Sequence, residues 1–541
     1  MRRLLGTGAA ILIASCGGNS PAAPATSSTT TFTPVVTRVV VSPGTAQLTV
    51  GSSATLSASV RDQRDSAMAG KMVTWASSVP TVATVSAAGV LTGVAAGTSS
   101  VTATVEGKAG SATVTVTAAS APPPSEFQTT VPSYELNVIG ARPSTNAATL
   151  SLYSPTDRTA TVTLLGDGRT FSVPLTGGTA ANLDITGLTQ DRAYRYRVDA
   201  GAASVSGQFR TARSAGASYR FTMQADSHLD GNSDTRIYAN TMANIAADSS
   251  DFLIDLGDTF MSDKFQDYHD AAPMYPAQRY YFGLAGATTP VFLVQGNHDA
   301  ENGWLPANAA WAAAMRTRYF AAPQANAFYA TGTARNYFAW TWGDATYIAL
   351  DPYYFTSSKP TGTNAGWMWT LGREQYDWLV GVLQRNTSPY TFVFLHHLVG
   401  GNGTDARGGS EASVFFEWGG KNLDGSSGFA ANRAGWSKPI HDLFVQYKVS
   451  AVFHGHDHLY VHQERDGIAY QEVPQPSFAR EGQTSSAVDY GYLSGTLQAS
   501  SGHLRITVTP ARATVEYIRS RLTAGNGGVV DSYTIAPAVR P

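Results

Sequence analysis

The chain has 541 residues, more than one ordinary domain holds, so we expect about three folded units. Lysine and arginine total 37 and aspartate and glutamate total 39, which leaves a formal charge of -2. A chain without a basic excess has no field for holding nucleic acid by its phosphates, so no nucleic-acid-binding surface is expected. Charged residues make up only 14%, and this low share favours β-rich extracytoplasmic modules.

The N-terminus has the features of an export signal. A basic start at residues 1–3 precedes an apolar stretch at residues 4–14, which is shorter than the roughly 20 apolar residues that cross a bilayer. Cys16 is the only cysteine, so no intramolecular disulfide is possible. Together with Ile13, Ala14 and Ser15, it forms a segment that resembles the lipobox of bacterial lipoproteins.

This resemblance implies that the signal at residues 1–15 is removed and that Cys16 then carries lipid. The mature chain would lie outside the cytoplasm, anchored to a membrane of the cell envelope. The alternative is an ordinary secretory signal with a chance cysteine, which would give a secreted protein.

Residues 16–34 lack apolar periodicity and predict a flexible linker. From 35 to 118, short alternating runs such as ATLSASV and SVTATV are separated by turn-forming residues, which predicts a small β-sandwich. The stretch VTWASSVPTVATVSAAGVLTGVAAGTSSVTATV resembles the bacterial Ig-like domain of group 2, with Trp75 as a core residue. No cluster of acids, histidines or hydroxyl–base pairs occurs here, so we expect a spacer or a module that contacts a cell surface or polymer.

A second β module follows a proline-rich linker at residues 119–126. Residues 127–212 repeat the pattern of short strands, and LDITGLTQDRAYRYRV resembles the fibronectin type III signature, with Tyr194 at the tyrosine corner. A module of this kind before a catalytic domain also resembles the amino-terminal domain of purple acid phosphatases. Its expected role is structural.

From residue 214 onward, apolar strands alternate with helical patterns such as TRIYANTMANIAADSS and EQYDWLVGVLQRN, which predicts an α/β fold. In such a fold, ligands gather beyond the carboxyl ends of the strands. Five of these strands are followed by aspartate, asparagine or histidine, a donor set without thiolate that predicts a metal site. FTMQ precedes Asp226 and His228, FLIDL precedes Asp258, VFLVQ precedes Asn297, TFVFL precedes His396 and His397, and AVF precedes His454, His456 and His458.

These residues form an ordered motif set: Asp-x-His, Gly-Asp, Gly-Asn-His-Asp, a later His and Gly-His-x-His. In this order, they resemble the motifs of the calcineurin-like metallophosphoesterases, over residues 214–530. The resemblance implies an α/β four-layer sandwich, with helices flanking two β-sheets, after the two all-β sandwiches. HLRITVT and ATVEYIRS, near the end, are expected to complete its second sheet.

The resemblance also implies two metal ions. One ion would be bound by Asp226, His228, Asp258 and His458, and the other by Asp258, Asn297, His396 and His456. Asp258 would therefore be shared, which suits a carboxylate because its two oxygens can each reach one cation. Iron, manganese and zinc all suit these ligands.

The residues around the ligands are interpreted through the same resemblance. His298 and Asp299 are the expected catalytic residues: His298 would stabilise the transition state or protonate the leaving oxygen, and Asp299 fills the acidic position after it. His396 is expected to be the ligand, with His397 facing substrate or packing, although the choice between these two stays open. His454 lies outside the Gly-His-x-His motif and is expected to pack behind the ligands.

Two departures separate the chain from purple acid phosphatases. These enzymes place a tyrosine three residues after the shared aspartate, where this chain has Met261, and they lack the histidine that His228 supplies. No purple tyrosinate–iron colour is therefore expected. Many other relatives place an aspartate at that same position to orient the catalytic histidine, and Asp263 is a nearby candidate for this role.

A long glycine-rich segment at residues 396–436 follows the fourth ligand block, and long irregular loops tend to be functional. Arg407 in this segment is a candidate for holding phosphate oxygens. The alternative for Arg407 and for Lys421 is a solvated surface charge.

Two adjacent cations acidify a bridging water and clamp the attacking and phosphoryl oxygens. We therefore expect an extracytoplasmic, lipid-anchored phosphoesterase that hydrolyses phosphate mono- or diesters by attack of a metal-bridging hydroxide. The alternative is a surface adhesion or binding protein whose phosphoesterase-like domain is inactive. The intact ligand set favours the enzyme.

Overall fold

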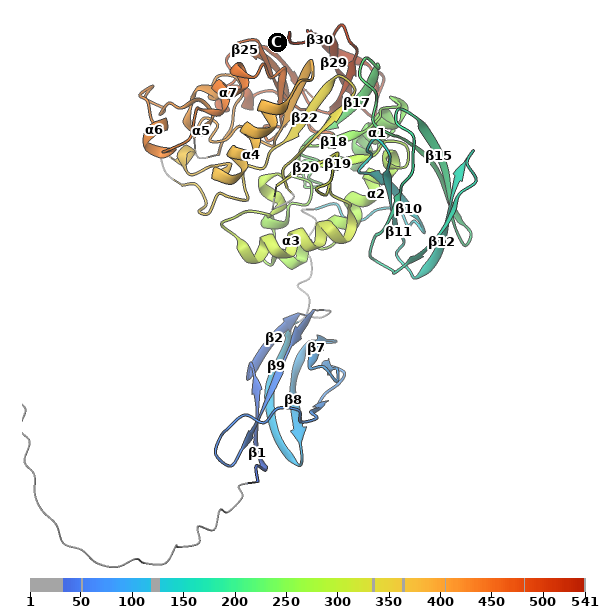
Figure 1. Cartoon of the computed structure of the whole chain (residues 1–541), viewed down its shortest axis with the longest axis vertical. Helices are drawn as coiled ribbons and strands as arrows, with labels where there is room; N and C mark the ends of the chain where they lie inside the picture. The colour runs from blue at the N-terminus through green and yellow to red at the C-terminus, as the bar shows by residue number, and fades with distance from the viewer. Residues whose placement is uncertain are drawn as a thin grey trace, which may run out of the picture. The chain divides into compact units, whose positions relative to one another are not determined.

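The computed structural model describes residues 33–49, 52–117, 127–332, 336–361, 365–403, 405–480 and 482–539. The chain divides into two compact units, Met1–Ala121 and Pro122–Pro541 (Figure 1). The predicted signal, Cys16 and the linker at residues 119–126 lie outside the described residues. In the part of the chain that the structure describes, no helix has the length and apolar character needed to cross a membrane.

The first unit contains a β-sandwich with an aliphatic core. Alternate residues of its longer strands point inward, so Val101, Val114 and Leu91 are fully buried, and Trp75 packs against them at half burial. The strands form three sheets: β1 (Val36–Ser42) with β4 (Ser57–Asp62); β2 (Thr45–Thr49), β9 (Lys108–Thr117), β8 (Gly97–Val105) and β5 (Thr74–Ser77); and β3 (Ser53–Thr55), β7 (Val90–Gly93) and β6 (Ala83–Val85).

The second unit begins with another β-sandwich. Its two sheets face each other across a core that includes Leu150, Val162 and Val198. The Tyr194 hydroxyl accepts a hydrogen bond from the backbone N–H of Thr189 at 2.7 Å, the contact of a tyrosine corner. One sheet contains β10 (Asn137–Ala141), β11 (Ala148–Tyr153) and β14 (Ala181–Ile185), and the other contains β13 (Thr170–Leu175), β12 (Arg158–Leu165), β15 (Ala193–Ala200) and β16 (Ala203–Arg210).

The rest of this unit is built on two larger sheets, as the sequence predicts. Phe221 of one sheet and Phe392 of the other meet in the aromatic core between them, with ring centroids 5.7 Å apart. The six-stranded sheet has the order β19 (Val291–Leu293), β18 (Leu253–Asp255), β17 (Tyr219–Gln224), β28 (Gly502–Val508), β29 (Ala513–Arg519) and β30 (Val529–Ile535). The eight-stranded sheet has the order β20 (Ala330–Thr331), β21 (Phe338–Trp342), β22 (Ala345–Ala349), β23 (Tyr390–Phe394), β24 (Ala451–His454), β26 (Ile468–Glu472), β25 (Leu459–Arg465) and β27 (Thr496–Ala499).

Helices cover the outer faces of both sheets, which gives the four layers. Met242 of α1 and Phe282 of α2 pack with Leu253 outside the six-stranded sheet, and Leu379 of α4 packs with Val393 outside the eight-stranded sheet. The predicted architecture is therefore confirmed. The helices are α1 (Thr235–Ala247), α2 (Met274–Gly286), α3 (Pro306–Tyr319), α4 (Gly372–Arg385), α5 (Phe416–Gly419), α6 (Phe429–Asn432), α7 (Ile440–Gln446) and α8 (Ser486–Asp489).

The five strands that precede the polar residues belong to both sheets: β17, β18 and β19 run parallel in one, and β23 and β24 run parallel in the other. One expectation about the sheets needs correction. The late strands β28 and β29 do not complete the second sheet, because β28 pairs antiparallel with β17 and so extends the first.

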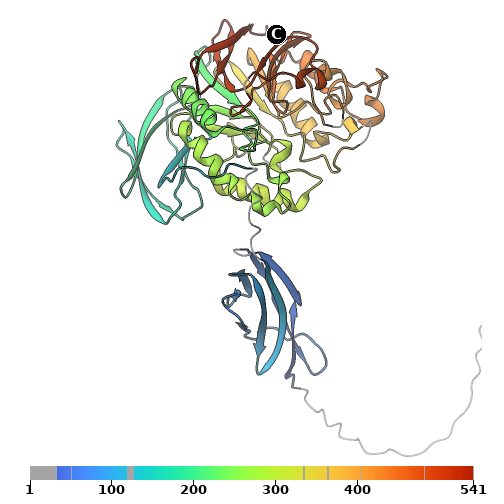
Figure 2. The same ribbon diagram turned by 180° about the vertical axis from the view of Figure 1, so that it is seen from behind.

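The fibronectin-like sandwich packs directly on the catalytic layers. Strand β10 lies beside α2, as both views show (Figures 1 and 2). The Tyr196 hydroxyl of β15 donates to the backbone carbonyl of Ala287, just after α2, at 2.7 Å. This sandwich is therefore part of the same compact unit as the catalytic layers.

Candidate metal centre

The polar residues that follow the five strands meet where the two sheets come together. Asp226 follows β17, Asp258 follows β18, and His396 follows β23. Several of them adopt the left-handed backbone region, with φ of 61° at Asp226, 54° at Asp258 and 83° at His456. Such conformations are costly for residues other than glycine and persist at functional sites when the surroundings hold them.

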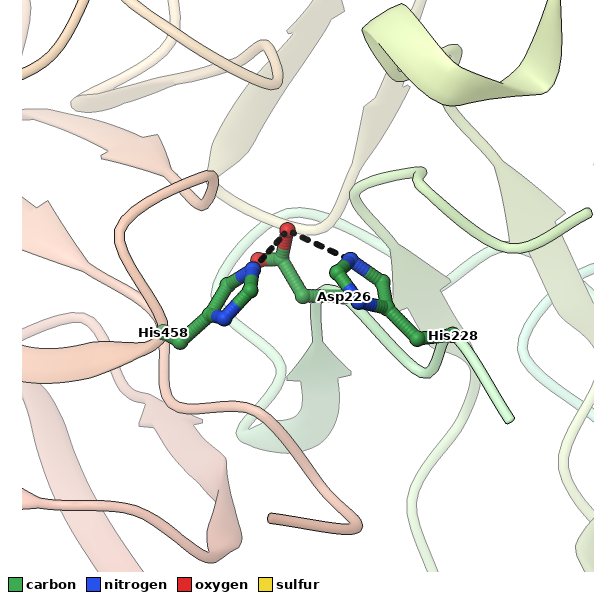
Figure 3. A group of neighbouring side chains, drawn as sticks. All are labelled: Asp226, His228 and His458. Atoms are coloured by element: carbon green, nitrogen blue, oxygen red, sulfur yellow. Dashed lines mark ion pairs between the residues drawn. The ribbon is translucent and has the colours of Figure 1, made fainter. Parts of the chain in front are cut away.

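Asp226 lies between two imidazoles in the first cluster (Figure 3). Its Oδ1 is 3.6 Å from Nε2 of His228 and 3.4 Å from Nε2 of His458. Asp226 is fully buried, and its Oδ2 accepts the backbone N–H of His456 at 2.9 Å. This second contact fixes the carboxylate so that Oδ1 faces both imidazoles.

Asp258, His396 and His456 form the second cluster. Oδ2 of Asp258 is 3.1 Å from Nε2 of His396 and 3.7 Å from Nε2 of His228, which belongs to the first cluster. Oδ1 of Asp258 accepts the backbone N–H of His298 at 2.7 Å. Asp258 therefore stands between the two clusters, at the position expected of a shared ligand.

The donor atoms at this centre suit metal cations. Oδ1 of Asp226, Nε2 of His228, Oδ1 of Asn297 and Nε2 of His396 are buried and have no hydrogen-bond partner among the described residues. Buried polar atoms normally have a hydrogen-bond partner, so four that lack one in the same place are the arrangement expected of atoms that bind a cation. Carboxylate, amide and imidazole donors together fit divalent iron, manganese or zinc.

Further contacts orient the imidazoles. Nδ1 of His396 contacts the Leu256 carbonyl at 2.9 Å, and Nε2 of His456 contacts the Asp405 carbonyl at 2.7 Å. Because a carbonyl only accepts, each contacting nitrogen carries the proton and the other nitrogen keeps its lone pair. His396 therefore offers Nε2 to a cation and His456 offers Nδ1. Behind them, Nδ1 of His454 contacts Glu472 at 2.7 Å, which is a packed position.

The charges of the centre favour the anionic carboxylates. Burial opposes charge on Asp226, but His396 and His458 outweigh it and hold the pKa of Asp226 far below its ordinary value. Burial also lowers the pKa of His396, but Asp258 and Asp226 outweigh this effect and raise it to about 9. A proton on His396 therefore competes with a cation for Nε2, so cation binding releases this proton and weakens as the pH falls.

His298 stands beside the clusters and is oriented by Asp263. Its Nδ1 lies 2.9 Å and 3.1 Å from the two Asp263 oxygens, and its Nε2 lies 4.0 Å from Oδ2 of Asp258. Met261 occupies the position where many relatives carry the orienting aspartate, and the structure brings Asp263 to His298 instead. The only sequence signal for this contact was that Asp263 lies two residues after Met261.

Asp299 was expected to be catalytic, but its contacts are those of a residue that positions others. Its carboxylate accepts four backbone N–H groups at 2.8 to 3.0 Å, and only 2% of the residue is exposed. Burial raises the pKa of Asp299, Asp258 raises it further, and the N–H donors oppose both. The carboxylate thereby ties the Asp258 loop to the Asn297 loop from beneath. The four donors belong to Gly296, Asp258, Thr259 and Phe260.

A cleft of about 300 Å³ opens beside the centre. Arg407 lines it, but its guanidinium donates to Asp457 and to the His456 carbonyl, both at 2.8 Å, so it supports the ligand loop. His397 is buried and packs against Trp369, with ring centroids 4.6 Å apart, and it does not line the described cleft. Burial, followed by the charge of His396, lowers the pKa of His397 to about 3.

Other residues of this cleft were not predicted from the sequence. Lys264 and Lys359 line it together with Trp304 and Trp369. Each stands in an irregular segment without a strand or motif beside it, so no local signal marked it. The two lysines add positive charge to the cleft, and the two tryptophans add flat apolar surface.

Comparisons with known proteins agree with the geometry. A sequence profile of the calcineurin-like phosphoesterases matches residues 219–460, and one of the bacterial Ig-like domain (group 2) matches residues 35–118. No curated protein matches the chain in sequence.

A solved structure, PhoD, resembles the chain in fold. PhoD is 14% identical over 77% of this chain and 91% of its own, with a TM-score of 0.53. A purple acid phosphatase from yellow lupin (Lupinus luteus) seeds is 12% identical over 92% of this chain and 96% of its own, with a TM-score of 0.49. Residues 35–118 thus form a bacterial Ig-like domain and residues 219–460 belong to a calcineurin-like phosphoesterase domain, which makes the chain a metal-dependent phosphoric ester hydrolase.

Proposed function

We propose that this protein is an extracytoplasmic phosphoesterase that hydrolyses phosphate mono- or diesters with two metal ions. The observation that carries the proposal is the place of Asp258, whose Oδ2 lies 3.1 Å from His396 and 3.7 Å from His228. One carboxylate within reach of both clusters allows two cations to be held side by side.

The candidate ligands form two groups, one for each cation. Asp226, His228 and His458 would hold one cation, and His396, His456 and Asn297 the other, with Asp258 common to both. When bound, cations of iron, manganese or zinc would supply Lewis acidity and an activated water as the nucleophile. Asn297 binds through a neutral amide oxygen, so the centre keeps net positive charge to attract phosphate.

His298 is the residue that would act on the ester. It lines the cleft beside Asn297, and its Nδ1 donates to Asp263, so Nε2 carries a proton only when the ring is an imidazolium. From there it can hydrogen-bond a phosphoryl oxygen or protonate the leaving oxygen. Lys264 and Lys359 line the same cleft and add charge that favours an anionic substrate.

We further propose that Cys16 anchors the protein through lipid to a membrane of the cell envelope. The support is the sequence around Cys16, in which a basic start, an apolar stretch and small residues precede the cysteine. Replacement of Cys16 by serine should move the protein from the membrane fraction to the soluble fraction. Retention of the variant in the membrane fraction would contradict the anchor.

The test of the enzymatic proposal compares substrates and metal content. Wild type should bind two metal ions and cleave an aryl phosphate monoester, a bis-aryl diester or both, and the ratio of the two rates identifies the substrate class. Asp258→Ala should lose most of the metal and nearly all activity, because both cations share this carboxylate. Wild-type protein that binds two metals and cleaves neither ester would support an inactive binding protein instead.

A further inference from the structure

The first two described residues of the fibronectin-like domain lie against the loops of the metal centre. The backbone N–H of Gln128 donates to the Leu229 carbonyl at 2.6 Å. Its side-chain amide donates to the carbonyls of Asp230 at 3.1 Å and Ser233 at 2.5 Å. Gln128 thus gives three hydrogen bonds to the backbone of one short loop, residues 228–233, which begins with a predicted metal ligand.

This loop has an unusual backbone that needs support. His228 and Leu229 both have positive φ, 42° and 60°, and neither is glycine. Backbone of this kind persists only where the surroundings over-determine it. Ser477 of the catalytic domain holds the flanks, by contacts to the Ser227 carbonyl and the Asp234 N–H, and the Ala479 N–H donates to the Asn232 carbonyl at 2.7 Å. Gln128 adds the contacts to the carbonyls of Leu229, Asp230 and Ser233.

The loop also orients the His228 ring. Nδ1 of His228 lies 3.4 Å from Oδ2 of Asp230, while Nε2 faces Asp226. The carbonyl of Asp230 is one of the three that Gln128 binds. A shift of this carbonyl would therefore move the carboxylate that fixes the imidazole, and such partners of metal-binding histidines influence metal affinity.

Phe127 reaches the other side of the centre. Its ring stacks on Phe265, with centroids 4.6 Å apart and planes at 24°. Phe265 directly follows the turn Ser262–Lys264, which contains the Asp263 that orients His298. Two adjacent residues of one domain therefore contact both the His228 loop and the Asp263 turn of the other.

We propose that Phe127 and Gln128 are positioning residues of the metal centre. The fibronectin-like domain then contributes to metal binding and catalysis in addition to its structural role. Gln128 holds the His228 loop in the conformation that binds one of the two cations. Phe127 holds the Asp263 turn. The proposal rests on the proposed function, in that it takes the Asp226, His228 and His458 cluster to be a cation site.

The test measures metal binding by the full-length protein. Apoprotein prepared with a chelator is titrated with Mn²⁺ or Zn²⁺ in a calorimeter. Gln128→Leu keeps the size of the side chain but removes both amide donors, and it should weaken one of the two cation sites by roughly tenfold while the other stays unchanged. Its kcat should return to the wild-type value at saturating metal.

A matched control is Gln190→Leu. Gln190 belongs to the same domain, and its amide also donates to a backbone carbonyl, that of Arg213 at 3.5 Å. This contact lies outside the metal loops, so both cation affinities should stay at the wild-type value. Phe127→Leu, a second variant, should lower kcat while leaving both affinities within about twofold, because it acts on the Asp263 turn.

The outcomes separate the two proposals. If wild type binds two cations and Gln128→Leu binds both with unchanged affinity, the positioning role is overturned and the proposed function stands. If wild type binds no cation, the proposed function itself fails. Should Gln128→Leu fold poorly, Gln128→Glu removes the same donors with a polar side chain, and unchanged affinities in that variant would overturn the role equally.

Discussion

The carboxylate of Asp263 contacts Nδ1 of His298, and this pair is the feature of the centre that depends most on a single residue. The contact distances of 2.9 Å and 3.1 Å involve both carboxylate oxygens. An imidazole fixed in this way carries a proton on Nδ1 and turns Nε2 toward the cleft, where the imidazolium form can donate its second proton. Asp263 touches neither cluster, so its effect on the reaction passes through His298.

Asp263→Asn should therefore lower kcat by roughly tenfold or more, since an effective general acid contributes about 10²–10⁴-fold. KM should change little, because the residue does not bind substrate. Steady-state kinetics on an aryl phosphate measure both values.

Asp267→Asn is the matched control, because Asp267 forms a similar contact, at 2.7 Å, with Nδ1 of His269 in the same region. Its kcat should match wild type. Equal kcat values for the two variants and wild type would contradict the role of Asp263.

At the residue scale, the sequence predicted the candidate ligands well because each follows an apolar strand directly. Asp226, Asp258 and His396 could be found in this way, since the carboxyl ends of these strands, although they belong to two sheets, lie close together. The positioning roles of Asp299 and Gln128 could not be predicted in this way. Their contacts are hydrogen bonds to distant backbone groups, and no residue type or spacing marks such contacts along the chain.

At the scale of single elements, β18 ends in a buried aspartate that shapes the next loop. Oδ1 of Asp255 accepts from the Thr259 hydroxyl at 2.6 Å, and Oδ2 accepts from the Gln224 amide at 2.9 Å. Burial raises the pKa of Asp255 to about 6. These contacts turn the chain toward Asp258.

This raised pKa predicts a pH dependence of the free energy of unfolding. The unfolded chain releases the Asp255 proton near pH 3.9, while the folded chain keeps it to about pH 6. The folded state binds more protons in this window, so the contribution of Asp255 is present below it and lost as the pH rises through it. Asp255→Asn should remove this loss, of about 3 kcal/mol.

Urea unfolding from pH 4.5 to 7 measures the effect, in chelator so that metal binding does not contribute. The free energy of unfolding of wild type should fall relative to that of Asp255→Asn as the pH rises. Parallel curves for the two proteins would show that Asp255 does not titrate in this range.

Elements with strong periodicity were predictable, and strand partners were not. The apolar spacing of TRIYANTMANIAADSS and EQYDWLVGVLQRN corresponds to α1 and α4. The run HLRITVT was expected in the second sheet, but it forms β28 beside β17, which is far away in sequence. Alternation identifies a strand and its buried face, whereas the pairing partner depends on long-range packing.

At the scale of the whole molecule, the fibronectin-like domain is joined to the catalytic layers through a buried arginine. Arg279 of α2 donates to the Ser151 carbonyl at 2.7 Å and to the Tyr319 carbonyl, and its guanidinium lies 5.5 Å from the Tyr153 ring. Burial lowers the pKa of Arg279 to about 10, so it stays charged at neutral pH. These contacts of Arg279 could not be predicted from the sequence, because Ser151, Arg279 and Tyr319 lie far apart in the chain and no motif marks them.

Arg279→Met should destabilise the second unit by about 3 kcal/mol, because the buried carbonyls of Ser151 and Tyr319 lose their donor. The urea midpoint measures this loss. Arg236→Met is the control, since Arg236 is exposed and pairs only with Asp234 among the described residues, and its midpoint should stay unchanged. An unchanged midpoint for Arg279→Met would contradict the importance of this junction.

The central claim is that two cations lie on either side of Asp258. An anomalous difference map from a crystal grown with Mn²⁺ tests it most directly. The account predicts two peaks that both contact Asp258, one also beside His228 and His458 and the other also beside His396 and His456. A single peak that does not contact Asp258, or no peak at saturating Mn²⁺, would contradict it.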